Sequence, residues 1–335
     1  MTSSTTASFW TKSSPDSSVN NFDKERRIFD ILAFNMNRRE FILGATAVAG
    51  VAGCRTGGGG NGGGGILFGA CRGVKDAKLM ASIGYDFWEW GAGAAFDPDK
   101  DGEWWKRQKE EILSQPIPLR SCNGFIPGKF RLTGPKADFE PALKYAETVL
   151  RRAEEVGTKT IVFGSSGARN VPGDICGDKA QKPLPEKGVE QYTEFARLLC
   201  ARVADLKTVQ IVIEPLRPNE SNIINYVWQG LQICHEVDSP RLRQLADIFH
   251  MMMGREEPDS IVKAGDLLKH CHIASYDTRL FPGSDPATVG RLKPYFDALK
   301  AIGYTGGVSC ECGWGKKEDL AKNLETALNT MKGLV

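Results

Sequence analysis

The first feature that this sequence lacks is an excess of basic charge. Its 43 Lys and Arg residues are nearly balanced by 41 Asp and Glu residues, which leaves a formal net charge of +2. A protein that binds nucleic acid usually presents a clear basic surface to the phosphates. The composition, 41% hydrophobic and 25% charged, is that of an ordinary soluble globular protein. The charge balance therefore argues against nucleic acid as a partner.

The nine cysteines include no C-x-x-C pair. A zinc ribbon needs such pairs as ligands, so this class of structural site is excluded. Several cysteines lie in or beside short apolar runs, where a free thiol behaves as a small buried hydrophobe. These are Cys71, Cys122, Cys271, Cys310 and Cys312. The cysteines therefore do not predict a disulfide framework.

The apolar run near the N-terminus is too short to cross a bilayer. It extends from Phe41 to Gly53, thirteen residues, whereas a spanning helix needs about 20. The run follows Met36-Asn-Arg-Arg and ends in Val51-Ala-Gly-Cys54, which resembles the lipobox of bacterial lipoproteins. Residues 36–54 therefore predict a twin-arginine export signal with a lipidated Cys54. We expect a periplasmic protein that reaches the membrane only through this lipid anchor.

Two stretches beside this signal cannot form a core. Residues 1–35 are rich in Ser, Thr, Asn and charge without a sustained period, so we expect disorder there and Met36 as the true start. Residues 55–65 are Gly-rich, which predicts a flexible tether. A phosphate-binding loop is excluded because no strand precedes the glycines and no Gly-Lys-Ser/Thr follows them.

Residues 66–335 alternate short apolar runs with amphipathic stretches, the pattern of βα units. Helical spacing predicts one helix from the N-cap Asp138 to Gly157 and another over Val189–Leu206. We expect eight strands, at residues 67–70, 85–90, 118–123, 160–164, 209–214, 242–247, 270–275 and 307–311. Eight such units in about this length predict an α/β fold, a (β/α)8 TIM barrel that forms a single catalytic domain.

The last four predicted strands each end at a side chain that can bind a metal ion. These are Glu214, Asp247, His272 and Glu311, separated by 33, 25 and 39 residues, about one βα unit each. The C-terminal ends of barrel strands meet at one face, so the four side chains should converge. Any one of them alone would more often be structural. Their joint occurrence at unit spacing predicts a shared divalent site.

Strand alternation supports this placement. Successive side chains of a strand point to opposite faces, so Ile211 and Ile213 can face the helices while Val212 and Glu214 face the barrel axis. In the same way Cys310 and Cys312 should point outward and leave Glu311 inside.

The order Glu, Asp-x-x-His, His, Glu resembles the xylose isomerase-like barrel superfamily of sugar isomerases and epimerases, especially its hydroxypyruvate isomerase and tagatose epimerase branch. The resemblance extends from about Ile66 to the C-terminus and implies metal ligands at the four residues above. It also implies contacts to substrate oxygens from Glu220, His250 and Arg279. Arg217 and Pro218 replace the Asn-Arg spacing of that family before Glu220.

Other residues at predicted strand ends could line the same site. In Trp88-Glu89-Trp90, Glu89 is expected to contact the substrate and the rings could stack on a sugar, although ordinary core packing of the tryptophans is an equal alternative. Asn123 follows the third strand and could also reach the substrate. His235, on a helix, is expected at the surface or in packing. His270 begins its strand and should lie low in the barrel, away from the metal.

Three carboxylates and one imidazole suit a hard or borderline ion, Mn²⁺ first, with Mg²⁺, Co²⁺ or Zn²⁺ as alternatives. Such an ion polarises a carbonyl and stabilises the enediolate formed when the neighbouring C–H loses its proton. Glu214 and Glu311 come from the fifth and eighth strands, so they can bracket a sugar and exchange this proton. The expected function is a metal-dependent sugar isomerase or epimerase, with a homo-oligomer left open.

Three alternatives use the same scaffold. A lyase would eliminate the glycosidic oxygen of a 3-keto-glycoside, a substrate that an exported enzyme meets readily. A non-catalytic sugar-binding lipoprotein would not need the paired Glu214 and Glu311. An apurinic-site endonuclease needs a multi-zinc cluster with many more than the four His of this chain, and a basic surface that faces DNA.

Overall fold

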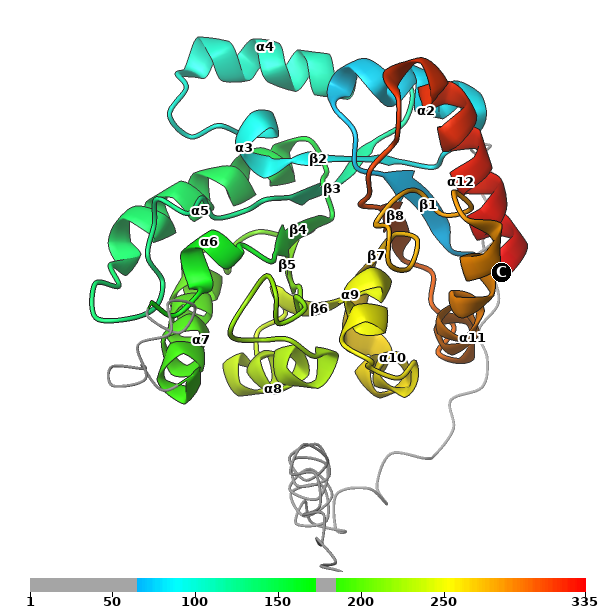
Figure 1. The fold of residues 1–335 in the computed structure, drawn as a ribbon. Coiled ribbons are helices and arrows are strands. Elements are labelled where there is room, and N and C mark those ends of the chain that lie inside the picture. Colours follow the sequence, from blue (N-terminus) through cyan, green and yellow to red (C-terminus); the bar gives the residue numbers. More distant parts are fainter. Residues whose placement is uncertain (1–64, 173–184) are drawn as a thin grey trace, which may run out of the picture. The chain divides into compact units, whose positions relative to one another are not determined.

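In the part of the chain that the structure describes, eight short strands alternate with helices (Figure 1). All hydrogen-bonded neighbours are parallel, in the order β1-β8-β7-β6-β5-β4-β3-β2. The strands are β1 (Leu67–Ala70), β2 (Trp88–Gly91), β3 (Leu119–Asn123), β4 (Thr160–Phe163), β5 (Gln210–Ile213), β6 (Leu242–Asp247), β7 (Leu268–Ile273) and β8 (Gly307–Cys310). This arrangement confirms the predicted α/β barrel.

The computed structural model describes residues 65–172 and 185–335. These residues belong to one compact unit, Gly62–Val335. The predicted extension, export signal and lipobox, together with residues 55–64 of the predicted tether, lie outside the described residues. Within the described ranges, the helices lack the combination of length and apolar character that crossing a membrane requires.

The barrel closes between its first two strands at a narrow seam. A single parallel bridge joins Cys71 to Glu89, and the Arg72 amide donates a hydrogen bond to the Glu89 carbonyl at 2.9 Å. The other strand pairs share longer ladders. Glu89 therefore occupies the point where the two edges of the sheet meet.

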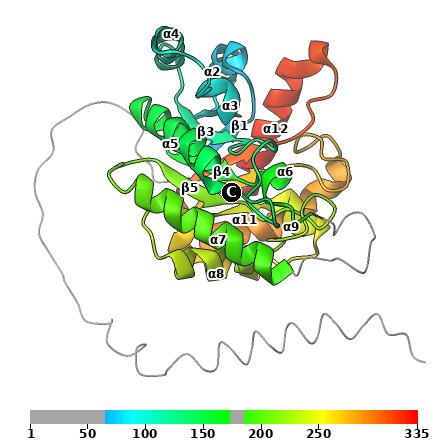
Figure 2. The ribbon, with the colours of Figure 1, turned by 90° about the vertical axis from the view of Figure 1, so that its left-hand side faces the viewer.

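The helices cover the outer face of the sheet, and α5, α7 and α8 lie side by side along it (Figure 2). The helices are α2 (Ala77–Ile83), α3 (Ala92–Ala95), α4 (Gly102–Leu113), α5 (Phe139–Glu155), α6 (Ser166–Arg169), α7 (Pro185–Arg202), α8 (Val227–Val237), α9 (Ile248–Met253), α10 (Asp259–Ala264), α11 (Lys293–Ala301) and α12 (Leu320–Leu334). The loops between the described elements contain four short 3-10 helices: η1 (Val74–Asp76), η2 (Gly265–Leu267), η3 (Pro286–Arg291) and η4 (Lys317–Asp319).

Among the described residues, two separate apolar clusters distinguish the side of β5 that faces the helices from the side that faces the barrel axis. The large cluster between sheet and helices includes Ile211, Ile213 and Cys310. A small cluster on the barrel axis consists of Val162, Val212 and Leu245. This division confirms the predicted alternation along β5, because Val212 points inward and its two neighbours point outward.

Some element boundaries differ from the prediction. β2 begins at Trp88 rather than residue 85, because the backbone of Asp86 and its carboxylate both bond to Phe68 before the ladder to β3 begins. β7 begins at Leu268, two residues earlier than expected, because Leu268 already pairs with Gln244 of β6. α5 follows Asp138 as predicted, although the Asp138 side chain makes no capping hydrogen bond.

Candidate metal centre

The four predicted metal ligands converge at the C-terminal end of the barrel. Asp247 ends β6, His272 lies in β7, and Glu214 and Glu311 directly follow β5 and β8. One ligand atom from each residue lies within 4.8 Å of the others. Asp247 and His272 are also Cα partners in the ladder between β6 and β7. The geometric part of the prediction, four strand ends that deliver four ligand atoms to one point, is therefore met.

The ring of His272 lies at the middle of this cluster. Its Nδ1 atom is 2.8 Å from Glu214 Oε1, 3.7 Å from Glu311 Oε2 and 4.0 Å from Asp247 Oδ2. The side chain of Glu311 is 23% exposed, whereas those of the other three ligands are 6% exposed or less. Glu311 therefore stands on the solvent side of the cluster, where a substrate can reach it.

Electrostatics in this cluster favours a bound cation. Burial, together with the nearby Glu214 and Asp247 carboxylates, raises the pKa of Glu311 to about 7. Burial opposes a charge on His272, but the Glu89 and Glu311 carboxylates outweigh it and raise the pKa of His272 well above its usual value. Glu311 and His272 thus hold protons that a divalent ion would displace. The donor set of carboxylate oxygens and one imidazole nitrogen fits Mn²⁺ or a similar ion.

This competition predicts a pH dependence of metal binding. Glu311 and His272 must each lose a proton before they can bind an ion, and each lost proton changes the affinity by roughly tenfold per pH unit. Because Glu311 protonates as pH falls through about 7, we expect Mn²⁺ affinity to fall by roughly a hundredfold per unit below that pH. Mn²⁺ titrations followed by electron paramagnetic resonance across this range measure it. A dissociation constant independent of pH would contradict the assignment of these two ligands.

Two arginines and a phenylalanine organise the groups predicted to contact substrate. Glu220 Oε1 accepts hydrogen bonds from Arg217 Nε and Arg279 Nη1, each at 2.8 Å. Both guanidinium groups lie over the ring of Phe249, at 5.1 and 5.0 Å from its centroid. Arg279 Nη2 also donates to Glu311 Oε2 at 3.2 Å. Arg217, where the sequence departs from the family pattern, thus shares Glu220 Oε1 with Arg279.

His250 lies between the metal ligands and Glu220. Its Nε2 atom is 3.6 Å from Asp247 Oδ2 and 3.8 Å from Glu220 Oε2. The ring is buried, and neither nitrogen makes a hydrogen bond with the protein. A buried polar group without a partner costs about 1–3 kcal/mol. These free nitrogens are therefore well suited to bind a ligand oxygen, which agrees with the expected role of His250.

Among the other expected site residues, Asn123 contacts the cluster but Trp88 does not. Asn123 Nδ2 donates to Glu311 Oε1 at 2.7 Å, so this amide orients the carboxylate. Trp88 is fully buried in the cluster between sheet and helices, with its ring against Trp90. The suggestion that Trp88 stacks on a sugar is therefore wrong, because this strand turns its tryptophans outward and Glu89 inward.

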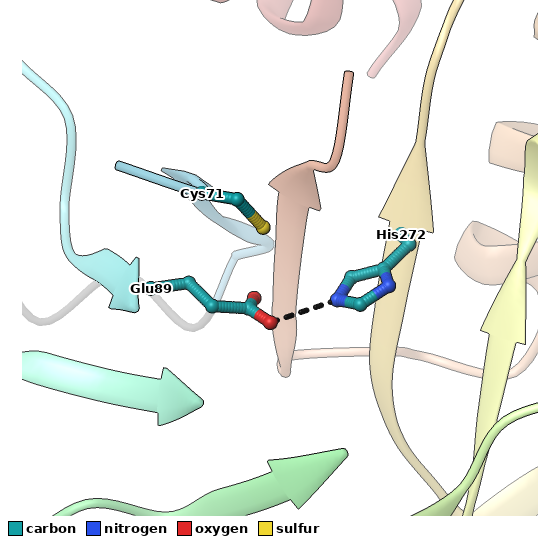
Figure 3. Close-up of side chains that lie close together, drawn as sticks. All are labelled: Cys71, Glu89 and His272. Carbon is teal, nitrogen blue, oxygen red and sulfur yellow. Dashed lines mark hydrogen bonds and ion pairs between the residues drawn. The ribbon is translucent and has the colours of Figure 1, made fainter. Parts of the chain in front are cut away.

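Glu89 does not face the substrate side either. It is fully buried, and its carboxylate is shared by two imidazoles, of which Figure 3 shows that of His272. Glu89 Oε1 is 2.9 Å from His272 Nε2 and Oε2 is 2.8 Å from His270 Nε2. From the sequence, Glu89 is expected to contact the substrate. It instead contacts Nε2 of His272, the ring nitrogen that faces away from the other metal ligands. His270 lies deep in the barrel, as predicted, yet it connects to the site through Glu89.

Two residues that sequence reasoning missed hold Glu214 in place. Arg169, at the end of α6, is fully buried and donates to the Glu214 carbonyl at 2.8 Å. Gly164 leaves room for the carboxylate, because a Cβ at this position would lie 2.1 Å from Glu214 Oε2. Neither residue could be recognised as functional from the sequence. Arginine in a short connecting segment and glycine after a strand are both common.

The fold and this constellation define the class of the protein. The family model of the xylose isomerase-like TIM barrel matches residues 77–334. The chain therefore belongs to the xylose isomerase-like TIM barrel family, which confirms the predicted resemblance.

Individual relatives fall among the sugar epimerases. A probable ketose 3-epimerase of Synechocystis sp. is 29% identical over 198 residues, which cover 58% of this chain and 64% of that protein. D-psicose 3-epimerase from Clostridium cellulolyticum H10, solved with D-tagatose, has a TM-score of 0.69 at 18% identity, over 80% of this chain and 99% of that one. For the 3-keto-D-glucoside 4-epimerase of E. coli the TM-score is 0.64 at 20% identity, over 80% and 98%. The match to the Synechocystis protein thus spans just under two thirds of its length.

Proposed function

We propose that the chain is a divalent-metal-dependent sugar epimerase that acts on a ketose. The observation that carries this proposal is the convergence of Glu214, Asp247, His272 and Glu311 within 4.8 Å, beside Glu220, His250 and Arg279. Similarity to a ketose 3-epimerase adds support for the substrate class.

The bound ion would polarise the substrate carbonyl and stabilise negative charge on the neighbouring oxygens as an enediolate forms. Glu214 and Glu311 approach from β5 and β8, strands that are separated in the sheet by β6 and β7. One carboxylate removes the proton from the carbon beside the carbonyl, and the other returns a proton to the opposite face of that carbon. This sequence inverts one stereocentre and leaves the carbon skeleton unchanged. Return to the adjacent carbon would instead give an isomer.

The remaining residues orient the sugar and keep the two carboxylates in place. Arg279 bridges Glu220 and Glu311, so a sugar that contacts Glu220 lies next to the base. His250 offers unbonded ring nitrogens to a hydroxyl. Asn123 donates to Oε1 of Glu311 and Arg279 donates to Oε2, so both oxygens of this carboxylate are held. A well-placed acid or base typically contributes 10² to 10⁴-fold to the rate.

Proton NMR in D₂O tests the proposal directly. The full chain with Mn²⁺ is incubated with a panel of free ketoses and 3-keto-glycosides. We expect deuterium at the carbon beside the carbonyl, with an epimer of an intact sugar as product. Release of an aglycone would instead support the β-eliminating lyase. Absence of exchange with every substrate would contradict catalysis and favour the sugar-binding lipoprotein.

The cellular setting belongs to the same proposal. The twin-arginine sequence and the lipobox at Cys54 support export and a lipid anchor, so the substrate would be a sugar met outside the cytoplasm. Mn²⁺ is our first choice of ion because three of the four ligands are carboxylates.

A further inference from the structure

We propose that Glu89 is a positioning residue of the metal centre, which fixes the ring orientation and tautomer of His272 while His270 holds Glu89 in place. The inference depends on the metal site of the proposed function but not on its sugar substrate. It concerns the far side of His272, away from the three other ligands.

On the side of His272 that faces away from the other ligands, the side chains of Glu89, His270 and His272 form a continuous hydrogen-bond network. The two Glu89 oxygens are 2.9 and 2.8 Å from His272 Nε2 and His270 Nε2. The side chains of Glu89 and His272 are 0% exposed and that of His270 is 1% exposed. His270 and His272 lie two residues apart on β7, so both rings point to the barrel interior. Figure 3 shows Glu89 directed from β2 toward His272 on β7.

The chemistry of imidazole explains what this network does. A neutral imidazole has one N–H donor and one nitrogen with a free lone pair. Nδ1 of His272 faces the Glu214, Asp247 and Glu311 carboxylates, so Nδ1 must supply the lone pair to an ion. The proton then belongs on Nε2, where Glu89 Oε1 accepts it. Carboxylates that bond the second nitrogen of a ligating histidine fix its orientation and raise its basicity.

His270 keeps the Glu89 carboxylate aimed at His272. Glu89 Oε2 lies 2.8 Å from His270 Nε2, and both side chains are buried. With Oε2 bonded to His270, the carboxylate has only Oε1 to offer His272. The network thus extends from the barrel seam at Glu89 to the ligand cluster.

Glu89 and His272 could also belong to a second metal site. One ligand atom each from Cys71, Glu89 and His272 also lies within 4.8 Å of the others, which could hold a separate ion. That ion would need the lone pair of His272 Nε2 while Nδ1 already serves the first cluster. Cys71 Sγ has other partners at hand, Ser309 Oγ at 3.6 Å and Asn123 Nδ2 at 3.8 Å. We therefore assign Nε2 a proton rather than a second metal.

The spectroscopic test uses the full chain loaded with Zn²⁺, a diamagnetic probe, and labelled with ¹⁵N-histidine. The chain contains four His, so few ring signals need assignment. We expect His272 to show a metal-bound Nδ1 and a slowly exchanging Nε2 proton, with one Zn²⁺ per chain. Zn²⁺ on His272 Nε2, or two tightly bound ions per chain, would overturn the proposal. This measurement needs no variant and no substrate.

The variant test replaces Glu89 with leucine, which removes both acceptors at similar size. We expect Glu89→Leu to weaken Mn²⁺ binding by roughly 10 to 100-fold and to abolish the slowly exchanging Nε2 proton of His272. The matched control is Ser121→Ala, because Ser121 pairs with Glu89 across the β2–β3 ladder, is fully buried and has a hydroxyl without a hydrogen bond. The control should bind Mn²⁺ like the wild type.

Equal Mn²⁺ affinity in wild type and Glu89→Leu, with both folded, would refute a positioning role. If Glu89→Leu does not fold, the wild-type spectrum still decides the tautomer and the number of ions. Because both readouts are made without sugar, a protein that binds metal as expected but epimerises nothing would contradict the proposed function and leave this inference standing.

Discussion

Glu311→Gln is expected to abolish epimerisation, with a fall in kcat of at least about 10³-fold, while the barrel remains folded. The amide removes the acid and base function of the side chain, which alone is worth about 10² to 10⁴-fold, and it weakens one of four metal ligands. The fold should tolerate the change because Glu311 directly follows β8 and its side chain is 23% exposed. A glutamine oxygen can still accept from Asn123. Deuterium exchange, Mn²⁺ titration and thermal unfolding measure the three effects separately.

A matched control is Glu318→Gln, an exposed carboxylate on η4 of the same chain segment. It should leave turnover unchanged. Glu214→Gln should cause a loss similar to that of Glu311→Gln, and the double variant should lose little more than either single one. Residues that act as one catalytic unit show such non-additive effects. Full activity of Glu311→Gln would remove this residue from the mechanism.

The residues that sequence reasoning located correctly are those with a one-dimensional signal. Glu214, Asp247, His272 and Glu311 lie at the ends of apolar runs spaced by one βα unit, and barrel geometry then places them together. Val212 followed from the alternation on the same strand. These relations depend only on the alternation of side chains along a strand and on the order of the βα units in the sequence. They can therefore be deduced without knowledge of side-chain contacts.

Glu89 and Trp88 show where such reasoning fails. The period of two says that Glu89 and Trp88 face opposite sides of β2, but not which side is the barrel interior. The inward direction of Glu89 depends on His270 and His272, which arrive from β7 nearly two hundred residues later, at sequence separations of 181 and 183. A preference for aromatic rings near sugars therefore gave the wrong choice for Trp88.

Arg169→Met is expected to cost about 3–5 kcal/mol of stability and to weaken Mn²⁺ binding. The Arg169 guanidinium donates to the Phe163, Glu214 and Ile224 carbonyls and to Ser221 Oγ. Each buried acceptor left without a donor costs about 1–3 kcal/mol, while removal of a buried charge offsets part of the loss. For a domain of this size the net change lowers Tm by roughly 6–20 °C. Calorimetry and Mn²⁺ titration measure the two effects.

The control is Arg131→Met, because Arg131 is exposed and its guanidinium donates to the carbonyl of Gly167 in the same helix α6. A surface change of this kind should stay within about 0.5 kcal/mol. Arg169→Lys separates charge from geometry, since one ammonium cannot span acceptors on both sides of the loop from Glu214 to Ile224. If the lysine variant keeps its stability and its Mn²⁺ affinity, charge alone supports that loop. If it loses both, the planar guanidinium group of Arg169, with its several donors, is required to keep Glu214 in position for metal binding.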